Sequence, residues 1–270
     1  MNRKEQYDRL IAESLPAATR TFLPEGKVYL NEKYRDFLWK ALDKNGNAGK
    51  MIKEFVRNNG RTKICSVASS ARLGFLYMEG REEPYELEKI LHAGVCHPNY
   101  DAFCEKEDQF YEFKCHEFCT SHPFVFSGSY QDLFTERFGK RYEIIESEGK
   151  PAGIIMPEET DFHIRRTTYY FDLKQLLCHI FGLLQYCEES GKKPSLKYVI
   201  FVPNEPWPDD TDSGLRKWKE DLKAELREIF SGIGETIVNV SGGQKKLSEV
   251  LRFDWCCQPV GDVQDLDCEG

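Results

Sequence analysis

Three charged residues stand in two short segments that are otherwise mostly apolar or aromatic. Asp101 belongs to "NYDAFCEKE" (99–107), and Glu112 and Lys114 belong to "QFYEFKCHEF" (109–118). Side chains two apart in a strand project to the same face, so Glu112 and Lys114 should project together. If the segments pair across the polar turn "KED", Asp101 falls near them. We therefore expect two carboxylates and an amine to meet at one spot.

Such a cluster has a defined chemical use. Two carboxylates suit Mg²⁺ or Mn²⁺, which keeps water ligands and takes others from a substrate phosphate. The metal lowers the pKa of a bound water and neutralises charge on the phosphate. Lys114 could orient that water and stabilise the transition state. The three residues thus predict phosphodiester hydrolysis, although a Glu-x-Lys pair alone is also common on solvated strand faces.

Further residues strengthen the catalytic interpretation. The segments around Asp101 and Glu112 are rich in phenylalanine and tyrosine, which indicates a buried strand pair where unpaired charge is costly. Glu88, on the preceding strand-like piece "YELEKIL", adds a carboxylate. In "FDLKQLLCHIFG", Gln175 and His179 are four apart and share one helix face. We expect Gln175 and His179 to support the site, His179 through packing or polar contacts.

Charge limits how the chain could meet a nucleic acid. The formal net charge is −8 and the isoelectric point is near 5.4, which argues against a globally basic binding surface. A local patch would be needed. The best candidates for phosphate contacts are Arg72, Lys140, Arg165 and Arg166, each of which could equally be ordinary surface charge.

The elements that would position these residues follow from the hydrophobic pattern. We expect helices through the first sixty residues, a compact apolar helix ending at Gly80, and three antiparallel strand pieces over 85–118. A less regular insertion follows, with a helix at 129–139 and a hairpin joining 141–145 to 152–156. The rest reads as a buried helix (169–190), a central strand (196–203), an amphipathic helix (215–234) and a strand (235–240).

This order predicts one mixed α/β domain. Its parts are a helical N-terminal extension (1–62), a catalytic domain (63–260) with an insertion at about 119–168, and an acidic tail (261–270) expected to fray. The 270 residues contain no apolar run of about 18 and no signal-peptide core, so we expect a cytoplasmic protein without a membrane partner. The ten cysteines are expected to be reduced thiols.

The pattern resembles the PD-(D/E)XK nuclease superfamily, the restriction-endonuclease-like fold. That family has an α-β-β-β-α-β core, with an acid on the second strand and E-x-K on the third. Asp101 matches the acid, and Glu112 with Lys114 matches the E-x-K. The element order fits from 67 to 203, about half the chain. The proline of the nominal motif is absent, since Asn99 and Tyr100 precede Asp101.

More narrowly, "ELEKIL", "NYDAF", "YEFKCHEF" and "FDLKQLLCHIFGL" are similar to bacterial restriction endonucleases of uncharacterised specificity. The resemblance implies a mixed sheet with C-terminal helix and strand additions, and a DNA endonuclease of the restriction or repair type. It implies Mg²⁺ or Mn²⁺ held by Asp101, Glu112 and Glu88, with Lys114 catalytic and Gln175 facing the site. A homodimer would suit cutting two strands.

Two alternatives stay open. The first is a catalytically inactive module that keeps this fold to bind a protein or nucleic acid. The second is a zinc-organised structural protein, since Cys115, Cys119 and His122 lie at loose zinc-ligand spacing. Against zinc, Cys104 and Cys115 alternate with the charged residues on the predicted strands and suit small core positions.

Overall fold

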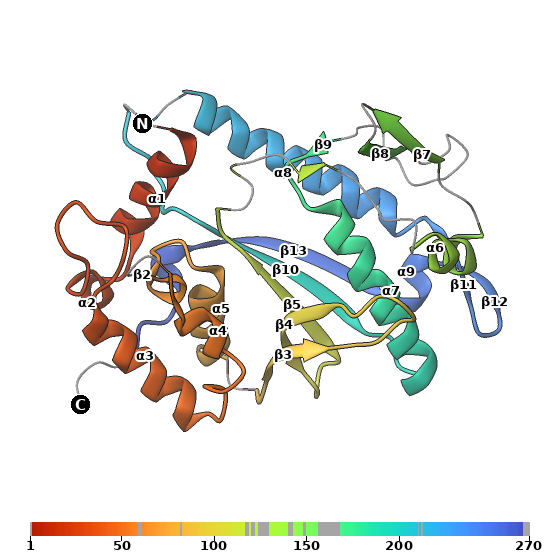
Figure 1. Cartoon of the computed structure of the whole chain (residues 1–270), viewed down its shortest axis with the longest axis horizontal. Helices are drawn as coiled ribbons and strands as arrows, with labels where there is room; N and C mark the ends of the chain where they lie inside the picture. Colours follow the sequence, from red (N-terminus) through yellow and green to blue (C-terminus); the bar gives the residue numbers. More distant parts are fainter. Residues whose placement is uncertain are drawn as a thin grey trace.

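A five-stranded mixed sheet forms the centre of the molecule in the computed structural model (Figure 1). The structure describes residues 2–58, 61–81, 83–116, 119, 122–123, 130–139, 143–147, 150–155, 168–209, 211 and 213–266. The strand order is β13-β10-β5-β4-β3. The bounds are β3 Glu86–Ile90, β4 Asn99–Cys104, β5 Gln109–Lys114, β10 Ser195–Val202 and β13 Arg252–Pro259.

The direction of the strands follows from the length of their connections. β3, β4 and β5 are joined by short turns and are antiparallel neighbours, as the sequence predicts. β10 comes after a helical crossover and runs parallel to both β5 and β13. The continuous apolar run predicted for a central strand is confirmed, because β10 has a neighbour on each side.

Alternation along β5 divides its side chains between the two faces of the sheet. Tyr111 and Phe113 contact Tyr77 of α5 (Ser70–Glu79) at centroid distances of 6.3 and 5.8 Å. Gly74 permits this close approach, because a Cβ there would clash with the Phe113 ring. Glu112 therefore projects to the opposite face.

That opposite face is covered by α7 (Leu173–Ser190) and α8 (Ser213–Ile233), which gives three layers (Figure 1). Tyr198 of β10 contacts Phe171 and Phe230 there, at 5.0 and 5.8 Å. α7 begins where the Asp172 side chain accepts from Gln175 N at 3.0 Å, and ends at Gly191 with a φ of +68°. These caps fix which turn of α7 faces β5.

The N-terminal helices pack into the same core as the sheet. The Tyr7 hydroxyl donates to the Phe201 carbonyl at 2.8 Å, and its ring contacts Trp218 of α8 at 5.6 Å. The helix expected at 50–59 is shorter than predicted: only α4 (Ile52–Phe55) forms before the chain turns extended. The elements of this region are α1 Arg3–Ser14, α2 Ala17–Arg20, α3 Glu32–Lys44, β1 Arg57–Asn58, β2 Arg61–Thr62 and η1 Lys63–Cys65.

Smaller elements lie outside the main sheet. The helix and the hairpin expected in the insertion are confirmed as α6 and the β7–β8 pair. None of the helices in the described part of the chain has the length and apolarity to span a membrane. The bounds are α6 Gln131–Phe138, β6 His122–Pro123, β7 Glu143–Ser147, β8 Lys150–Ile155, β9 Thr168–Tyr169, β11 Ile237–Val240, β12 Gly243–Lys246, α9 Leu247–Val250 and η4 Val260–Asp262.

The C-terminal region differs from the sequence prediction in two respects. The strand expected at 235–240 forms as β11, but it pairs with β12 in a separate hairpin, and β13 supplies the fifth strand of the sheet. The tail does not fray over 261–266, because the Asp265 carboxylate accepts from Thr19 N at 3.1 Å and Val263 is buried. A hydrogen bond from the distant helix α2 holds this segment, and the local sequence does not indicate that contact.

Candidate functional site

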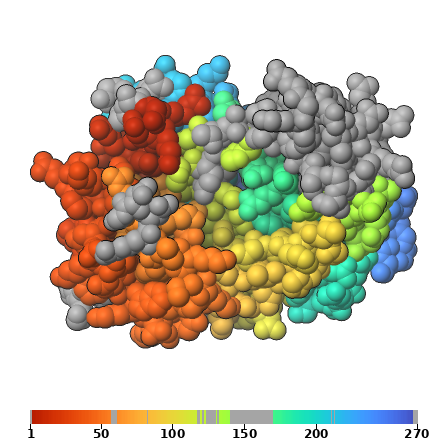
Figure 2. Space-filling model, in the orientation of Figure 1, coloured from red at the N-terminus to blue at the C-terminus, as the bar shows by residue number. Residues whose placement is uncertain are grey.

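Three carboxylates occupy corresponding positions on three neighbouring strands. The register of β3 with β4, on both sides of Glu88, leaves Glu88 opposite Asp101. The register of β4 with β5, continued by one residue, sets Asp101 opposite Glu112. Figure 2 shows where this region reaches the surface: β3 and β4 (yellow) and part of α7 (teal) lie between the orange N-terminal helices and the grey atoms. The three acids therefore stand at adjacent positions across the three strands.

Asp101 stands where β4 and β5 separate. Their regular pairing stops at Ala102 and Tyr111, and the Phe113 N–H donates to Asp101 Oδ2 at 2.7 Å instead of to a strand carbonyl. Burial raises the pKa of Asp101 well above its ordinary value, and the nearby charge of Glu112 raises it further. Such a carboxyl ionises at a cost that a bound cation would offset.

Glu112 is the most enclosed of the acids, with 3% of its side chain exposed. Its Oε1 accepts from Lys114 Nζ at 2.8 Å and from Gln175 Nε2 at 2.7 Å. Its Oε2 is buried and has no hydrogen-bond partner within the described chain; His179 Nε2, at 3.6 Å, is too distant. Leaving such an oxygen unpaired costs about 1–3 kcal/mol. Oε1 of Glu112 is thus held in place, whereas Oε2 is open to a further ligand.

His179 reaches the same carboxylate as a neutral side chain. Its Nε2 lies 3.3 Å from the Asn99 carbonyl, which only accepts, so we assign the proton to Nε2. Its Nδ1 then accepts from the Tyr198 hydroxyl at 2.9 Å. Burial lowers the pKa of His179, which keeps the ring uncharged. Within the described chain, His179 orders the helix and strand around Glu112.

Glu88 is held in an unusual backbone conformation, with a φ of +53°. The Asn99 side-chain amide donates to its carboxylate. Burial raises the pKa of Glu88, with smaller contributions from the charges of Glu54 and Glu112. A non-glycine residue with positive φ inside a strand is strained, and such strain is concentrated at functional sites.

Glu54, on α4, is a nearby acid that the sequence reasoning missed. Its Oε1 pairs with Lys63 Nζ at 2.8 Å, while its Oε2 is buried without a hydrogen-bond partner in the described chain. In the sequence Glu54 belongs to an apparently solvated helix face of the N-terminal extension. Only the packing of that extension against β3 brings it toward Glu88.

Of the four residues predicted to contact phosphate, the structure describes one, Arg72. Arg72 is fully buried on α5, where its Nη2 donates to the Val67 carbonyl at 2.8 Å. That burial is at odds with a surface contact to nucleic acid: the helix turns Arg72 into the core, over the Tyr34 ring. Lys140, Arg165 and Arg166 lie outside the described residues.

The residues present fit a hard divalent cation held by few protein ligands. Asp101 and Glu112 offer carboxylate oxygens on adjacent strands, and Oε2 of Glu112 lacks any other partner in the described chain. Within that same part of the chain, no group of three or more His, Cys, Asp or Glu residues is arranged to enclose a metal, zinc included. Mg²⁺ retains several waters and does not need such a cage.

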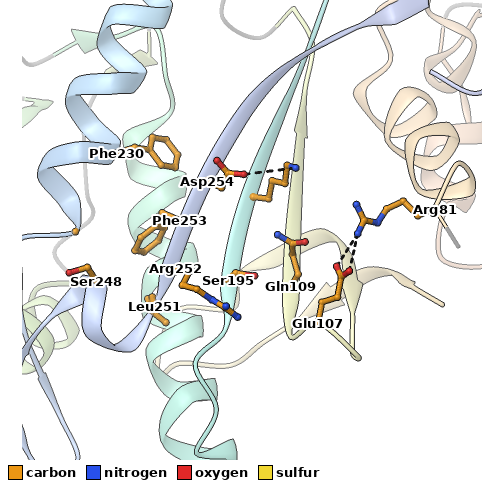
Figure 3. Close-up of a pocket in the computed structure, with 12 residues that line it drawn as sticks. Arg81, Glu107, Gln109, Ser195, Phe230, Ser248, Leu251, Arg252, Phe253 and Asp254 are labelled. Atoms are coloured by element: carbon orange, nitrogen blue, oxygen red, sulfur yellow. Dashed lines mark hydrogen bonds and ion pairs between the residues drawn. The ribbon is translucent and has the colours of Figure 1, made fainter. Parts of the chain in front are cut away.

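A cavity lies elsewhere, at the opposite end of β5. It measures about 770 Å³ and opens beside Gln109, the first residue of that strand. Arg81 and Glu107 form an ion pair on one side of the strands, and Phe230 of α8 lies on the other side (Figure 3). Two ion pairs line this cavity, Arg81 with Glu107 and Lys197 with Asp254.

Sequence and structure comparisons give no family for this chain. No protein-family model matches it, and neither a curated protein nor a solved structure is detectably similar to it.

Proposed function

We propose that this protein is a metal-dependent nuclease that hydrolyses phosphodiester bonds, a DNA endonuclease of the restriction or repair type. One observation carries the proposal. Glu112 is almost fully buried, and one of its oxygens is fixed by Lys114 and Gln175. The other oxygen has no hydrogen-bond partner in the described chain, and Asp101 lies on the adjacent strand. This is an arrangement that a cation completes.

The element order supports the same proposal. Helix α5, strands β3, β4 and β5, helix α7 and strand β10 follow one another as in the α-β-β-β-α-β core of the PD-(D/E)XK superfamily. Asp101 is on the second of these strands and the Glu-x-Lys on the third, which are the positions of the family motif. The absence of a proline before Asp101 is the departure from that motif.

Each residue has a defined task in the proposed reaction. Asp101 and Glu112, with Glu88 beside them, would hold Mg²⁺ or Mn²⁺, which supplies an acidified water and charge neutralisation when bound. Lys114, whose Nζ lies 2.8 Å from Glu112, orients the attacking water and stabilises charge on the phosphate. Gln175 keeps the Glu112 carboxylate aimed by its 2.7 Å hydrogen bond.

A cleavage assay tests the proposal. Labelled single-stranded, duplex and branched DNA, and RNA of matched sequence, are incubated with Mg²⁺, Mn²⁺ or a chelator. We expect cleavage of at least one substrate only with metal, and its loss in Asp101→Ala and Glu112→Gln. Circular dichroism controls for folding of the variants. Cleavage that survives either substitution, or the chelator, would rule out the assigned site.

A non-catalytic binding module is the second candidate, and one observation favours it. The chain is acidic overall, and Arg72, the one predicted phosphate contact among the described residues, is buried. That module predicts no cleavage and no Mn²⁺-dependent rise in melting temperature, since only a ligand that binds the native state stabilises it.

A further inference from the structure

Two thiols meet between the β3–β4 turn and helix α7, beside the candidate site but outside it. Cys96 lies in the turn and is 1% exposed, whereas Cys178 on α7 is half-buried. The Cys96 thiol donates to the Cys178 carbonyl, with its Sγ 3.6 Å from that oxygen. Neither Cys96 nor Cys178 is in a disulfide in the structure, so this contact is not yet a bond.

The backbone holds both cysteines in position. Cys96 exchanges two hydrogen bonds with Ala93, at 2.8 and 2.9 Å, which close the turn. One turn beyond Cys178, Gly182 lets α7 approach the β3–β4 turn, because a Cβ there would clash with Pro98 and with the Tyr100 hydroxyl. Helix and turn thus pack closely where the Cys96 thiol contacts the backbone of Cys178.

The surroundings make the two thiols unequal. The Cys96 thiol, the Tyr130 hydroxyl and the charge of Lys174 all favour the thiolate of Cys178; the hydrogen bond from Cys96 is the largest influence, and together they lower the Cys178 pKa. The same hydrogen bond, followed by burial, raises the pKa of Cys96. A half-buried thiolate beside a buried partner thiol is the arrangement of a reactive cysteine and the cysteine that resolves it.

We propose that Cys178 and Cys96 form a reversible disulfide when the protein meets a peroxide. The Cys178 thiolate attacks one peroxide oxygen, the O–O bond breaks, and Cys178 becomes a sulfenic acid while the leaving hydroxide takes a proton to give water. The Cys96 sulfur then attacks the Cys178 sulfur, its proton leaves with the hydroxyl as a second water, and the S–S bond forms. Two thiols are oxidised by two electrons in total, and one hydrogen peroxide is reduced to two waters.

The bond would join chain segments 82 residues apart. Cross-linking residues so distant in sequence restricts the unfolded chain and stabilises the native one. The proposal does not depend on the nuclease function, since neither cysteine contacts Glu112 or Lys114 in the structure.

Peroxide titration of the reduced, full-length protein tests the inference. After hydrogen peroxide is added and removed, we expect the intact mass to fall by two hydrogens and two free thiols to disappear. Peptide mapping should recover one cross-linked pair that contains Cys96 and Cys178. The melting temperature should rise and should return to its starting value after dithiothreitol.

Variants separate the two thiol roles. Cys96→Ser should stop at a Cys178 sulfenic acid that dimedone traps, and Cys178→Ser should remove both the trapping and the cross-link. Tyr130→Phe should slow the reaction. Cys187→Ser is the matched control, because Cys187 is also half-buried on α7 but burial raises its thiol pKa; it should react like the wild type.

Two results would overturn the proposal. One is a peptide map of oxidised wild-type protein without a Cys96–Cys178 link. The other is dimedone labelling of Cys96→Ser that falls on Cys187 as readily as on Cys178. The first measurement needs no variant, so a folding defect in a variant does not decide the outcome.

Discussion

The two ends of β5 carry charges under opposite conditions. Near the N-terminus of α7, where Gln175 contacts it, Glu112 is 3% exposed and its Oε2 has no hydrogen-bond partner in the described chain. At the other end, the Arg81–Glu107 pair, 2.9 Å apart, is 27% and 37% exposed and borders a cavity of about 770 Å³. The cavity end of β5, at Gln109, therefore has a partly exposed ion pair, whereas the closed end, at Glu112, has a buried carboxylate oxygen without a hydrogen bond in the described chain.

This difference shows why empty volume is a poor guide to chemistry here. An exposed ion pair contributes about 0.2–1 kcal/mol and is screened by salt, so it persists without any function. A buried, unsatisfied carboxylate oxygen costs about 1–3 kcal/mol, and its retention needs an explanation such as a bound cation. The following predictions compare the two ends, from the largest expected effect to the smallest.

The largest effect is expected from lysine substitutions at the two ends. Lys114→Ala should reduce the rate of metal-dependent cleavage by about 10²–10³-fold, because it removes a donor that stabilises charge in the transition state. Lys197→Ala, on the neighbouring strand and lining the cavity, is the matched control and should leave the rate unchanged. Single-turnover cleavage rates measure both, and equal losses would remove the distinction between the ends.

A smaller effect is expected from glutamine substitutions. Gln175→Ala frees the Glu112 carboxylate and should weaken Mn²⁺ binding or cleavage by about 10–100-fold. Gln109→Ala, at the cavity end of β5, should change neither. Titration of cleavage rate against Mn²⁺ concentration distinguishes a loss of metal affinity from a loss of maximal rate. A Gln175→Ala variant with wild-type metal dependence would contradict the role given to Gln175.

Asp101→Asn should make the metal-free protein more stable at neutral pH. The folded-state pKa of Asp101 lies above its ordinary value of 3.8, so the folded protein binds the proton more tightly than the unfolded chain. Stability from this group is therefore lost as pH rises from about 4 through the raised pKa. The uncharged amide avoids that loss and can still accept from Phe113 N.

The variant should show a gain in melting temperature over the wild type at pH 8, because it removes the carboxylate whose pKa burial raises. This gain should vanish near pH 4. Thermal melts in chelator at both pH values provide the measurement. A variant that is less stable than the wild type at pH 8 would show that Asp101 is not held as a costly carboxylate.

The smallest effect is expected at the cavity. Glu107→Gln should cost about 0.2–1 kcal/mol, and less in high salt, because its ion pair with Arg81 is partly exposed. Chemical denaturation at low and high salt measures the difference. A salt-independent loss well above this range would mean that the two ends of β5 resemble each other energetically.

Much of the central fold could be predicted from local pattern. The short turns between the segments over 85–118 predicted the antiparallel β3–β4–β5 meander, and the buried helix expected over 169–190 forms as α7, although it begins only at Leu173. Period-two alternation placed Glu112 and Lys114 together and Tyr111 and Phe113 on the other face, as observed. These features depend on neighbours in sequence, which is why a single sequence carries them.

What the sequence could not predict depends on distant contacts. β13 is a half-exposed edge strand without clean alternation, so its place beside β10 is set by the sheet rather than by its own residues. Arg72 is buried because the N-terminal helices cover the side of α5 that carries it, and nothing in the local sequence indicates that packing. Glu54 approaches Glu88 only through the same packing, and the positive φ of Glu88 has no signal in residue type.

Binding of Mn²⁺ tests the central claim most directly. Electron paramagnetic resonance counts free Mn²⁺ as protein is added, for the wild type, Glu112→Gln and the cavity control Glu107→Gln. The arrangement of Asp101 and Glu112 predicts that the wild type and Glu107→Gln remove Mn²⁺ from solution and that folded Glu112→Gln does not. Equal uptake by all three proteins, or none by the wild type, would contradict a metal site at the closed end of β5.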